Sequence, residues 1–123
     1  MASIHEHEIL IFSSVFAINY FVSNIYGDDN NSGTSLASPF KTIEKAATVM
    51  QAGDVCYIRK GLYHETINVE NINGSDGMPI LFTNYNNEKV VMDGTKSIDS
   101  IWTLHTENIW RTTINFDIWQ VFV

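Results

Sequence analysis

The sequence predicts an all-β fold with one short helix near its N-terminal end. Three observations lead to this prediction. After Gly53 the apolar residues recur with a period of two over short segments, as in β-strands. The connections between these segments are shorter still. No second helical stripe follows Gly53, so a doubly wound α/β fold would lack its crossover helices. An antiparallel sandwich or barrel and a parallel β-helix remain.

Composition narrows the class of protein. The chain has 123 residues, about one domain, and its 45% hydrophobic and 17% charged residues fit neither a disordered tail nor a membrane bundle. The formal net charge of -7 makes nucleic acid an unsuitable partner, because an acidic surface repels phosphate. A single cysteine, Cys56, excludes an intramolecular disulfide and a multi-cysteine zinc site. We expect Cys56 to be a small buried apolar residue.

Residues 1–17 are expected to be a signal peptide or a disordered extension, and residues 18–123 to form the domain. The apolar stretch Ile9–Ala17 is too short to span a bilayer, which needs about 20 residues, but it has the length of a signal-peptide core. Val15-Phe16-Ala17 is a tolerable cleavage site. The preceding segment lacks the usual Lys or Arg, which favours an extension instead. His5 and His7 within it are not expected to bind a metal.

The first elements are a strand over Asn19–Ser23, a polar loop and a short helix. Ser38 followed by Pro39 could start the helix, and Thr42 is a candidate N-cap for a later start. The apolar positions at i, i+3, i+4 and i+7 form one stripe, made of Ile43, Ala46, Ala47 and Met50.

The later segments alternate between polar and apolar residues. Predicted strands cover Asp54–Arg59, Leu62–Val69, Ile80–Tyr85 and Lys89–Asp93, followed by short pieces at 101–102, 109–114 and 120–123. Val55 and Ile80 open apolar strands about one solenoid turn apart, on the order of 20–30 residues. Hairpin turn signals are nearly absent. Both observations favour the parallel β-helix.

Several motifs follow one another in a familiar order. They include Gly27–Asn30, Ser38–Ile43, Lys45–Ala47, Gly61–Tyr63, Glu65–Ile67 and Val90–Thr95. This order resembles the N-terminal region of right-handed parallel β-helix proteins of the pectate-lyase-like superfamily, over roughly residues 20–123. The later pieces Asn108–Thr112 and Gln120–Val123 resemble a segment of secreted glycoside hydrolases with that fold. In this interpretation the helix covers both the unpaired strand edge and the apolar lumen of the first coil.

The resemblance implies a carbohydrate-active parent protein, a glycoside hydrolase or a polysaccharide lyase, with a polysaccharide as partner and an extracellular or cell-surface location. A non-catalytic β-helix adhesin or surface binding module is the alternative. The sequence stops at Val123 within an apolar strand, so we expect an incomplete solenoid that is inactive alone. The catalytic residues of such proteins lie in coils that this chain does not include, so no catalytic residue, cofactor or metal is assigned, and the oligomeric state stays open.

Polar residues in the loops receive structural interpretations. Asp28–Gly33 resembles the start of a calcium loop, but the position of the closing Glu is Pro39, so we expect an Asx-rich turn. Asp54 is expected to serve a turn. His64 and Glu65 are adjacent on a predicted strand and should face opposite sides. Glu65 could form a surface ion pair across the turn with Arg59 or Lys60, which would contribute little to stability.

A few residues invite a carbohydrate interpretation. Asp93 and Asp99 could line an outer face, but the sequence does not place them at the roughly 5–10 Å separation that glycoside hydrolysis requires. The three tryptophans are expected to pack in the core, with a sugar platform as the alternative; they are Trp102, Trp110 and Trp119. Two loops carry glycosylation sequons, at Asn30 and Asn73.

Overall fold

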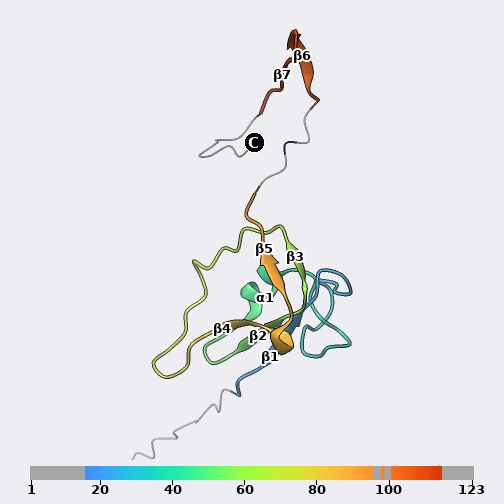
Figure 1. Ribbon diagram of the computed structural model, residues 1–123. Coiled ribbons are helices and arrows are strands. Elements are labelled where there is room, and N and C mark those ends of the chain that lie inside the picture. Colours follow the sequence, from blue (N-terminus) through green and yellow to red (C-terminus); the bar gives the residue numbers. More distant parts are fainter. Residues whose placement is uncertain (1–15, 96–97, 99–100, 115–123) are drawn as a thin grey trace, which may run out of the picture.

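The computed structural model describes residues 16–95, 98 and 101–114 of the chain. Strands dominate it, and one α-helix lies among them (Figure 1). The elements are β1 (Asn19–Val22), α1 (Ile43–Val49), β2 (Val55–Ile58), β3 (Gly61–Tyr63), β4 (Leu81–Asn84), the 3-10 helix η1 (Tyr85–Asn87), β5 (Val90–Met92), β6 (Thr103–Thr106) and β7 (Ile109–Arg111). No helix in these ranges has the length and apolar character that crossing a membrane requires.

The strands before residue 93 form parallel coils. One sheet has the order β1-β2-β4 and a second pairs β3 with β5, and every pairing in both sheets is parallel. Val55 lies opposite Leu81, 26 positions later, so this coil has a length within the predicted range. The preceding coil is longer, with 36 positions from Asn19 to Val55, because it also holds the polar loop and α1. The predicted right-handed parallel β-helix is therefore confirmed, and the sandwich alternative is wrong for these coils.

Alternate side chains of the first sheet point into an apolar lumen. Tyr20 and Val22 of β1 and Cys56 and Ile58 of β2 are buried, in keeping with the period of two. Burial raises the pKa of the Cys56 thiol to about 12, so that it stays protonated at neutral pH. The interpretation of Cys56 as a small buried apolar residue is confirmed.

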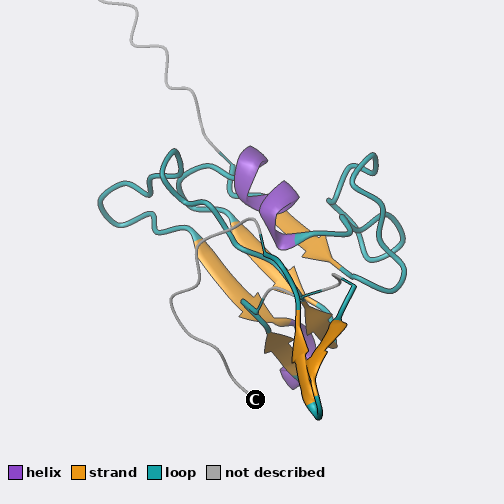
Figure 2. Cartoon of the chain, turned by 90° about the horizontal axis from the view of Figure 1, so that it is seen from above, coloured by secondary structure: helices purple, strands orange, loops and turns teal. Residues whose placement is uncertain are grey.

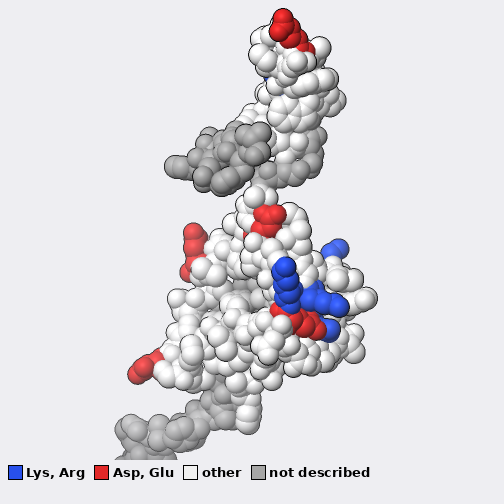
Figure 3. Space-filling view, viewed as in Figure 1, with Lys and Arg blue, Asp and Glu red and all other residues white. Residues whose placement is uncertain are grey.

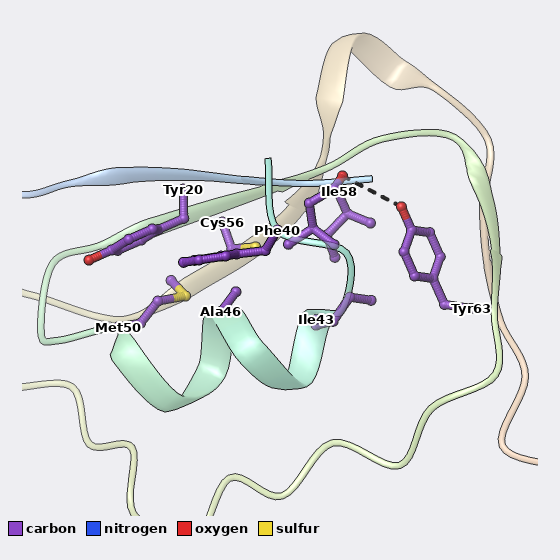
Figure 4. Packing of buried hydrophobic residues seen from close by; sticks show 9 residues of the cluster. Tyr20, Phe40, Ile43, Ala46, Met50, Cys56, Ile58 and Tyr63 are labelled. Atoms are coloured by element: carbon purple, nitrogen blue, oxygen red, sulfur yellow. Dashed lines mark hydrogen bonds between the residues drawn. The ribbon is translucent and has the colours of Figure 1, made fainter. Parts of the chain in front are cut away.

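The helix closes the lumen with the predicted stripe. Ile43, Ala46, Ala47 and Met50 are all buried, and Figure 4 shows the helix below the strands with Ile43, Ala46 and Met50 directed at Phe40, Cys56 and their neighbours. Figure 2 shows α1 lying beside the coil strands. The small alanines let the helix backbone approach the strands closely. Nonpolar burial of this kind contributes about 25 cal/mol per Å².

The helix begins at Ile43 with Thr42 as its N-cap, so the earlier start after Ser38 is wrong. Thr42 Oγ1 accepts a hydrogen bond from the Lys45 N–H at 3.1 Å. The carbonyl of Ser38 instead accepts the Gly33 N–H, and that of Pro39 accepts the Asp28 N–H. Ser38 and Pro39 thus belong to the loop that precedes the helix. Because their carbonyls bond within this loop, the helix begins only at Ile43.

This loop, rather than the helix, covers the open edge of β1. The Phe21 N–H donates to the Gly33 carbonyl at 2.7 Å, the Phe40 N–H donates to the Phe21 carbonyl at 2.8 Å, and the Ser23 N–H donates to the Phe40 carbonyl at 2.8 Å. Gly33 is required here, because its φ is +72° and a Cβ would lie 2.2 Å from the Phe40 ring. The expectation that the helix covers both the strand edge and the lumen is therefore wrong. The helix closes only the lumen, and the loop covers the edge.

All five strands predicted before residue 94 are shorter than expected, and two of them end early for identifiable reasons. The strand predicted over Leu62–Val69 ends at Tyr63, because β3 pairs only with the three residues of β5. Beyond Tyr63 the predicted strand makes no further β-ladder hydrogen bonds, but Ile67 still packs against the core. The strand predicted over Ile80–Tyr85 ends at Asn84, where η1 begins.

The last described strands depart from the parallel pattern. β6 and β7 form an antiparallel hairpin that lies apart from the coils in Figure 1. Trp102 and Trp110 are exposed, so the expectation that they pack in a core is wrong for this structure. Trp119 and the strand predicted at 120–123 lie outside the described residues, as do His5, His7 and Asp99.

Replacing Ile43 with alanine tests the lumen closure. Ile43→Ala removes fully buried methyl groups at the start of the helix stripe, and we expect a loss of about 2–5 kcal/mol in the free energy of unfolding. Urea denaturation measures this loss. Thr48→Ala on the exposed side of the same helix is the control, and an equal effect of both changes would contradict the packing of Ile43.

Candidate functional site

The carboxyl ends of β1, β2 and β4 meet at one corner of the coils, because parallel strands of a sheet end at the same edge. Tyr26 lies in the turn after β1, Arg59 and Lys60 follow β2, and η1 with Glu88 and Lys89 follows β4. The Gly61 N–H donates to the Lys89 carbonyl at 3.3 Å and ties the last two turns together. We call Arg59, Lys60 and Lys89 the basic corner.

An ion pair organises this corner. Arg59 Nε lies 2.9 Å from Glu88 Oε2, and the Lys60 N–H donates to the same oxygen at 2.7 Å. The Arg59 guanidinium also stacks over the Tyr85 ring, 5.2 Å from its centroid. The hydrogen bonds from Arg59 and from the Lys60 backbone lower the pKa of Glu88, and the pair with Glu88 raises the pKa of Arg59.

The other two cations of the corner have no such partner in the described part of the chain. Lys60 and Lys89 are exposed, and neither ammonium group forms an ion pair there. Figure 3 shows Lys and Arg surface (blue) gathered beside one acidic area (red) on the coils. With one carboxylate against three cations, the corner is locally positive although the chain as a whole is acidic.

Aromatic side chains border the corner. Phe21 and Tyr57 are cross-strand neighbours with stacked rings 5.6 Å apart, and Tyr85 meets both edge-on. These rings cover one another, so they offer little open ring face to a ligand. Tyr26, in contrast, is 77% exposed and makes no aromatic pair among the described residues. Its open face is suited to stacking against the C–H surface of a sugar.

Two carboxylates hold the start of α1. Glu65 Oε1 and Oε2 accept the N–H groups of Ile43 and Glu44 at 3.2 and 3.0 Å. Asp29 Oδ1 accepts the N–H groups of Lys41 and Thr42, both at 2.9 Å. The first helical amides, which lack partners within a helix, are therefore satisfied by charged acceptors.

The predicted pairing of Glu65 with Arg59 or Lys60 is consequently wrong. Glu65 turns inward to the helix, and Glu88 from the following coil pairs with Arg59 instead. The prediction considered only neighbours along the chain. Stacking of coils brings Glu88 beside Arg59 from 29 positions away.

Asp54 serves the turn before β2, as predicted, and it also binds the segment before β1. Its side chain is buried, Oδ2 accepts the Gln51 N–H at 2.8 Å, and Oδ1 accepts the Ile18 N–H at 2.8 Å. The second contact was not foreseen, because nothing in the spacing brings residue 18 next to residue 54.

His64 and Glu65 face opposite sides, as predicted. His64 Nδ1 lies 3.2 Å from Asp93 Oδ2, at equivalent places after β3 and β5. Hydrogen bonds from Thr95 are the main cause of the lowered pKa of Asp93, and His64 adds to it. Asp99, the other carboxyl of the pair considered with Asp93, lies outside the described residues.

The segment Asp28–Gly33 is an Asx-rich turn, as predicted. Asp28 Oδ1 accepts hydrogen bonds from the backbone and side chain of Asn30, and these bonds lower the pKa of Asp28. Asp29 points to α1. Over the described ranges no three His, Cys, Asp or Glu side chains are grouped as a metal site.

A shallow groove of about 370 Å³ runs between α1 and the segment at 68–72. Apolar and uncharged polar side chains line it, and Glu44 is the charged residue at its wall. A cation or an open aromatic face is missing from its lining. The corner is therefore the better candidate for a ligand surface.

Comparisons with known proteins agree with the fold. Residues 25–73 match a family model described as a protein of unknown function, DUF1565. The chain is 43% identical over 76 residues to the uncharacterized protein YwoF of Bacillus subtilis. The aligned residues make up 62% of this chain and 16% of YwoF. It is also 32% identical over 85 residues to pectate lyase PEL9 of Emericella nidulans. The aligned residues make up 68% of this chain and 20% of the lyase.

A solved structure is similar as well. XylC in complex with xylose matches 76% of this chain and 14% of its own length, with 35% identity and a TM-score of 0.64. The chain spans no more than a fifth of the curated relatives that it matches. The similarity to a pectate lyase and the parallel register together confirm the predicted resemblance to pectate-lyase-like β-helix proteins.

Exchanging Glu65 tests the helix cap. Glu65→Gln keeps the size of the side chain but removes its charge and one acceptor, so we expect a loss of about 1 kcal/mol in the free energy of unfolding. Thermal or urea denaturation measures the loss. Glu70→Gln is the matched exposed control, and equal stability of the two variants would show that Glu65 does not hold α1.

The Arg59–Glu88 pair predicts a pH dependence. Because the folded pKa of Glu88 lies below its usual 4.5, the pair stabilises the protein above that value and loses its contribution as the pH falls through the lowered pKa. Arg59→Gln should return the pKa of Glu88 toward 4.5, as measured by NMR titration of its carboxyl carbon. Arg111→Gln should leave this pKa unchanged; an unshifted Glu88 in Arg59→Gln contradicts the pairing.

Proposed function

We propose that this chain forms the capped first coils of a carbohydrate-active β-helix protein, a glycoside hydrolase or a polysaccharide lyase, and that it does not catalyse alone. The observation that carries the proposal is a parallel coil stack with a closed first coil in a chain that is 32% identical to a pectate lyase. The xylose-bound relative XylC supports a saccharide as the ligand class. These named relatives favour a carbohydrate-active parent over an adhesin.

Five carboxylates among the described residues are in keeping with this proposal. Asp29, Asp54 and Glu65 accept backbone N–H groups that hold the loops and the helix. A general acid for glycoside hydrolysis needs a raised pKa. The pKa values of Glu88 and Asp93 are lowered instead, so neither carboxyl group is suited to act as the general acid. These side chains serve the fold.

We place the polysaccharide contact of these coils at the basic corner. The ammonium groups of Lys60 and Lys89 supply charges for an acidic sugar, and the open face of Tyr26 supplies a stacking surface. Arg59 is held by Glu88 and orders the corner. We also propose an extracellular location, since such a partner is found there; the apolar stretch Ile9–Ala17 is the feature that supports export.

Turnover assays test the catalytic part of the proposal. The purified chain is incubated with a panel of acidic and neutral polysaccharides, and reducing ends and unsaturated products are measured. We expect no product above the heat-treated control. Robust product formation from any member of the panel would contradict the proposed lack of activity.

Affinity electrophoresis in gels that contain polygalacturonate tests the binding part. Lys60→Gln with Lys89→Gln should weaken the retardation of the chain several-fold, and so should Tyr26→Ala. Lys41→Gln with Arg111→Gln changes the net charge equally and should leave retardation unchanged. Retardation should also fall at an ionic strength of about 1 M, where charges are screened beyond about 3 Å. Equal retardation of both double variants would remove the corner from the proposal.

A further inference from the structure

The place where the folded coils begin is fixed by a buried carboxylate. Asp54 is 2% exposed, and its Oδ1 accepts the Ile18 N–H at 2.8 Å. The Val55 N–H donates to the Ile18 carbonyl at 3.0 Å, so both sides of residue 18 are held. Phe16 and Ala17, just before it, are exposed. The peptide bond between Ala17 and Ile18 is thus accessible on its N-terminal side and anchored on its C-terminal side.

The sequence carries a tolerable cleavage site at the same bond. Val15-Phe16-Ala17 has small or β-branched residues at the two positions that signal processing reads, and it ends the apolar stretch Ile9–Ala17. Two independent observations therefore meet at residue 18: a processing pattern that ends at Ala17, and a contact between the next nitrogen and a buried carboxylate.

We propose that the chain is cleaved between Ala17 and Ile18 and that the new α-ammonium group of Ile18 forms an ion pair with the buried Asp54 carboxylate. This inference rests on the proposed export. Hydrolysis consumes one water, leaving a carboxylate on Ala17 and an amine on Ile18 that takes up a proton. The amide nitrogen already lies at hydrogen-bond distance from Oδ1, so the charged group needs no new position.

Charge supports the pairing. Asp54 Oδ2 receives one backbone N–H from Gln51, and no cation forms an ion pair with Asp54 among the described residues. A buried carboxylate without a counter-ion is costly, and an ammonium group in contact offsets that cost. The other titratable group that senses Asp54 is Tyr20, whose pKa is raised by burial and by this carboxylate. Tyr20 is neutral at pH 7 and does not compete for the pairing.

The pairing has a defined pH dependence. A free α-amino group has a pKa of about 7.7–8.0, and contact with a carboxylate raises it. The pair therefore stabilises the processed chain fully below about pH 7.7 and loses its contribution as the pH rises through the raised pKa. A chain with an uncharged nitrogen at residue 18 lacks this dependence.

Processing is tested by expressing the whole chain in a secreting host and sequencing the N-terminus of the protein in the medium. The proposal expects Ile18 as the first residue. A different first residue would overturn the cleavage site, and retention of the whole chain in the cells would overturn the export on which it rests.

The ion pair is tested separately from export. Chains that begin at Ile18 are prepared with a free and with an acetylated amino group, and urea denaturation is followed from pH 6 to pH 10. The free form should have the higher urea midpoint at pH 6, and the difference should shrink as the pH rises. Equal midpoints at every pH would overturn the pairing.

An Asp54 variant separates pairing from a general effect of acetylation. Asp54→Asn is expected to abolish the difference between the free and the acetylated chain. Its single amide oxygen can accept only one of the two N–H groups that Asp54 binds, so both chains should lose stability by the same amount. If Asp54→Asn does not fold, NMR titration of the Ile18 amine in the unchanged chain decides the matter: a pKa above 8.0 supports the pairing, and an ordinary value overturns it.

Discussion

The first coil of a parallel stack has no coil before it, and this constraint shapes most of the described structure. Its strand would expose unpaired backbone groups, and its lumen would expose apolar side chains to water. Two separate elements of the chain cover these exposed groups. The loop through Gly33 and Phe40 bonds to the edge of β1, and α1 places Ile43 and Met50 against the lumen. Each element needs the other, because Phe40 contributes to both.

Three of the fourteen acidic residues serve this closure or the start of the next coil. A short helix and a tight loop leave many amides without helical partners, and Asp29 and Glu65 satisfy them. Asp54 does the same at the start of the second coil. Net charge is therefore a poor guide to the ligand, since a locally positive corner at Lys60 and Lys89 coexists with it.

Patterns of local origin could be predicted from the sequence. The stripe of α1, the strand at residues 19–22 and the period of β2 depend on neighbours along the chain, and all were identified correctly. The partners of Glu65 and Arg59 were not, because they come from other coils and depend on register. The corner was missed for the same reason: Tyr26 and Lys89 become neighbours of Arg59 only through stacking. The antiparallel hairpin of β6 and β7 was also not predicted, because no local signal in the sequence marks the end of the parallel pairing before it.

The parallel stack with its covered first edge is measured most directly by NMR contacts across the sheet. Cys56 should show contacts with both Tyr20 and Phe82, and the Phe21 amide should show a hydrogen-bond coupling to the Gly33 carbonyl. Close contacts between the Hα protons of facing residues on β1 and β2, the mark of antiparallel pairing, would contradict the account.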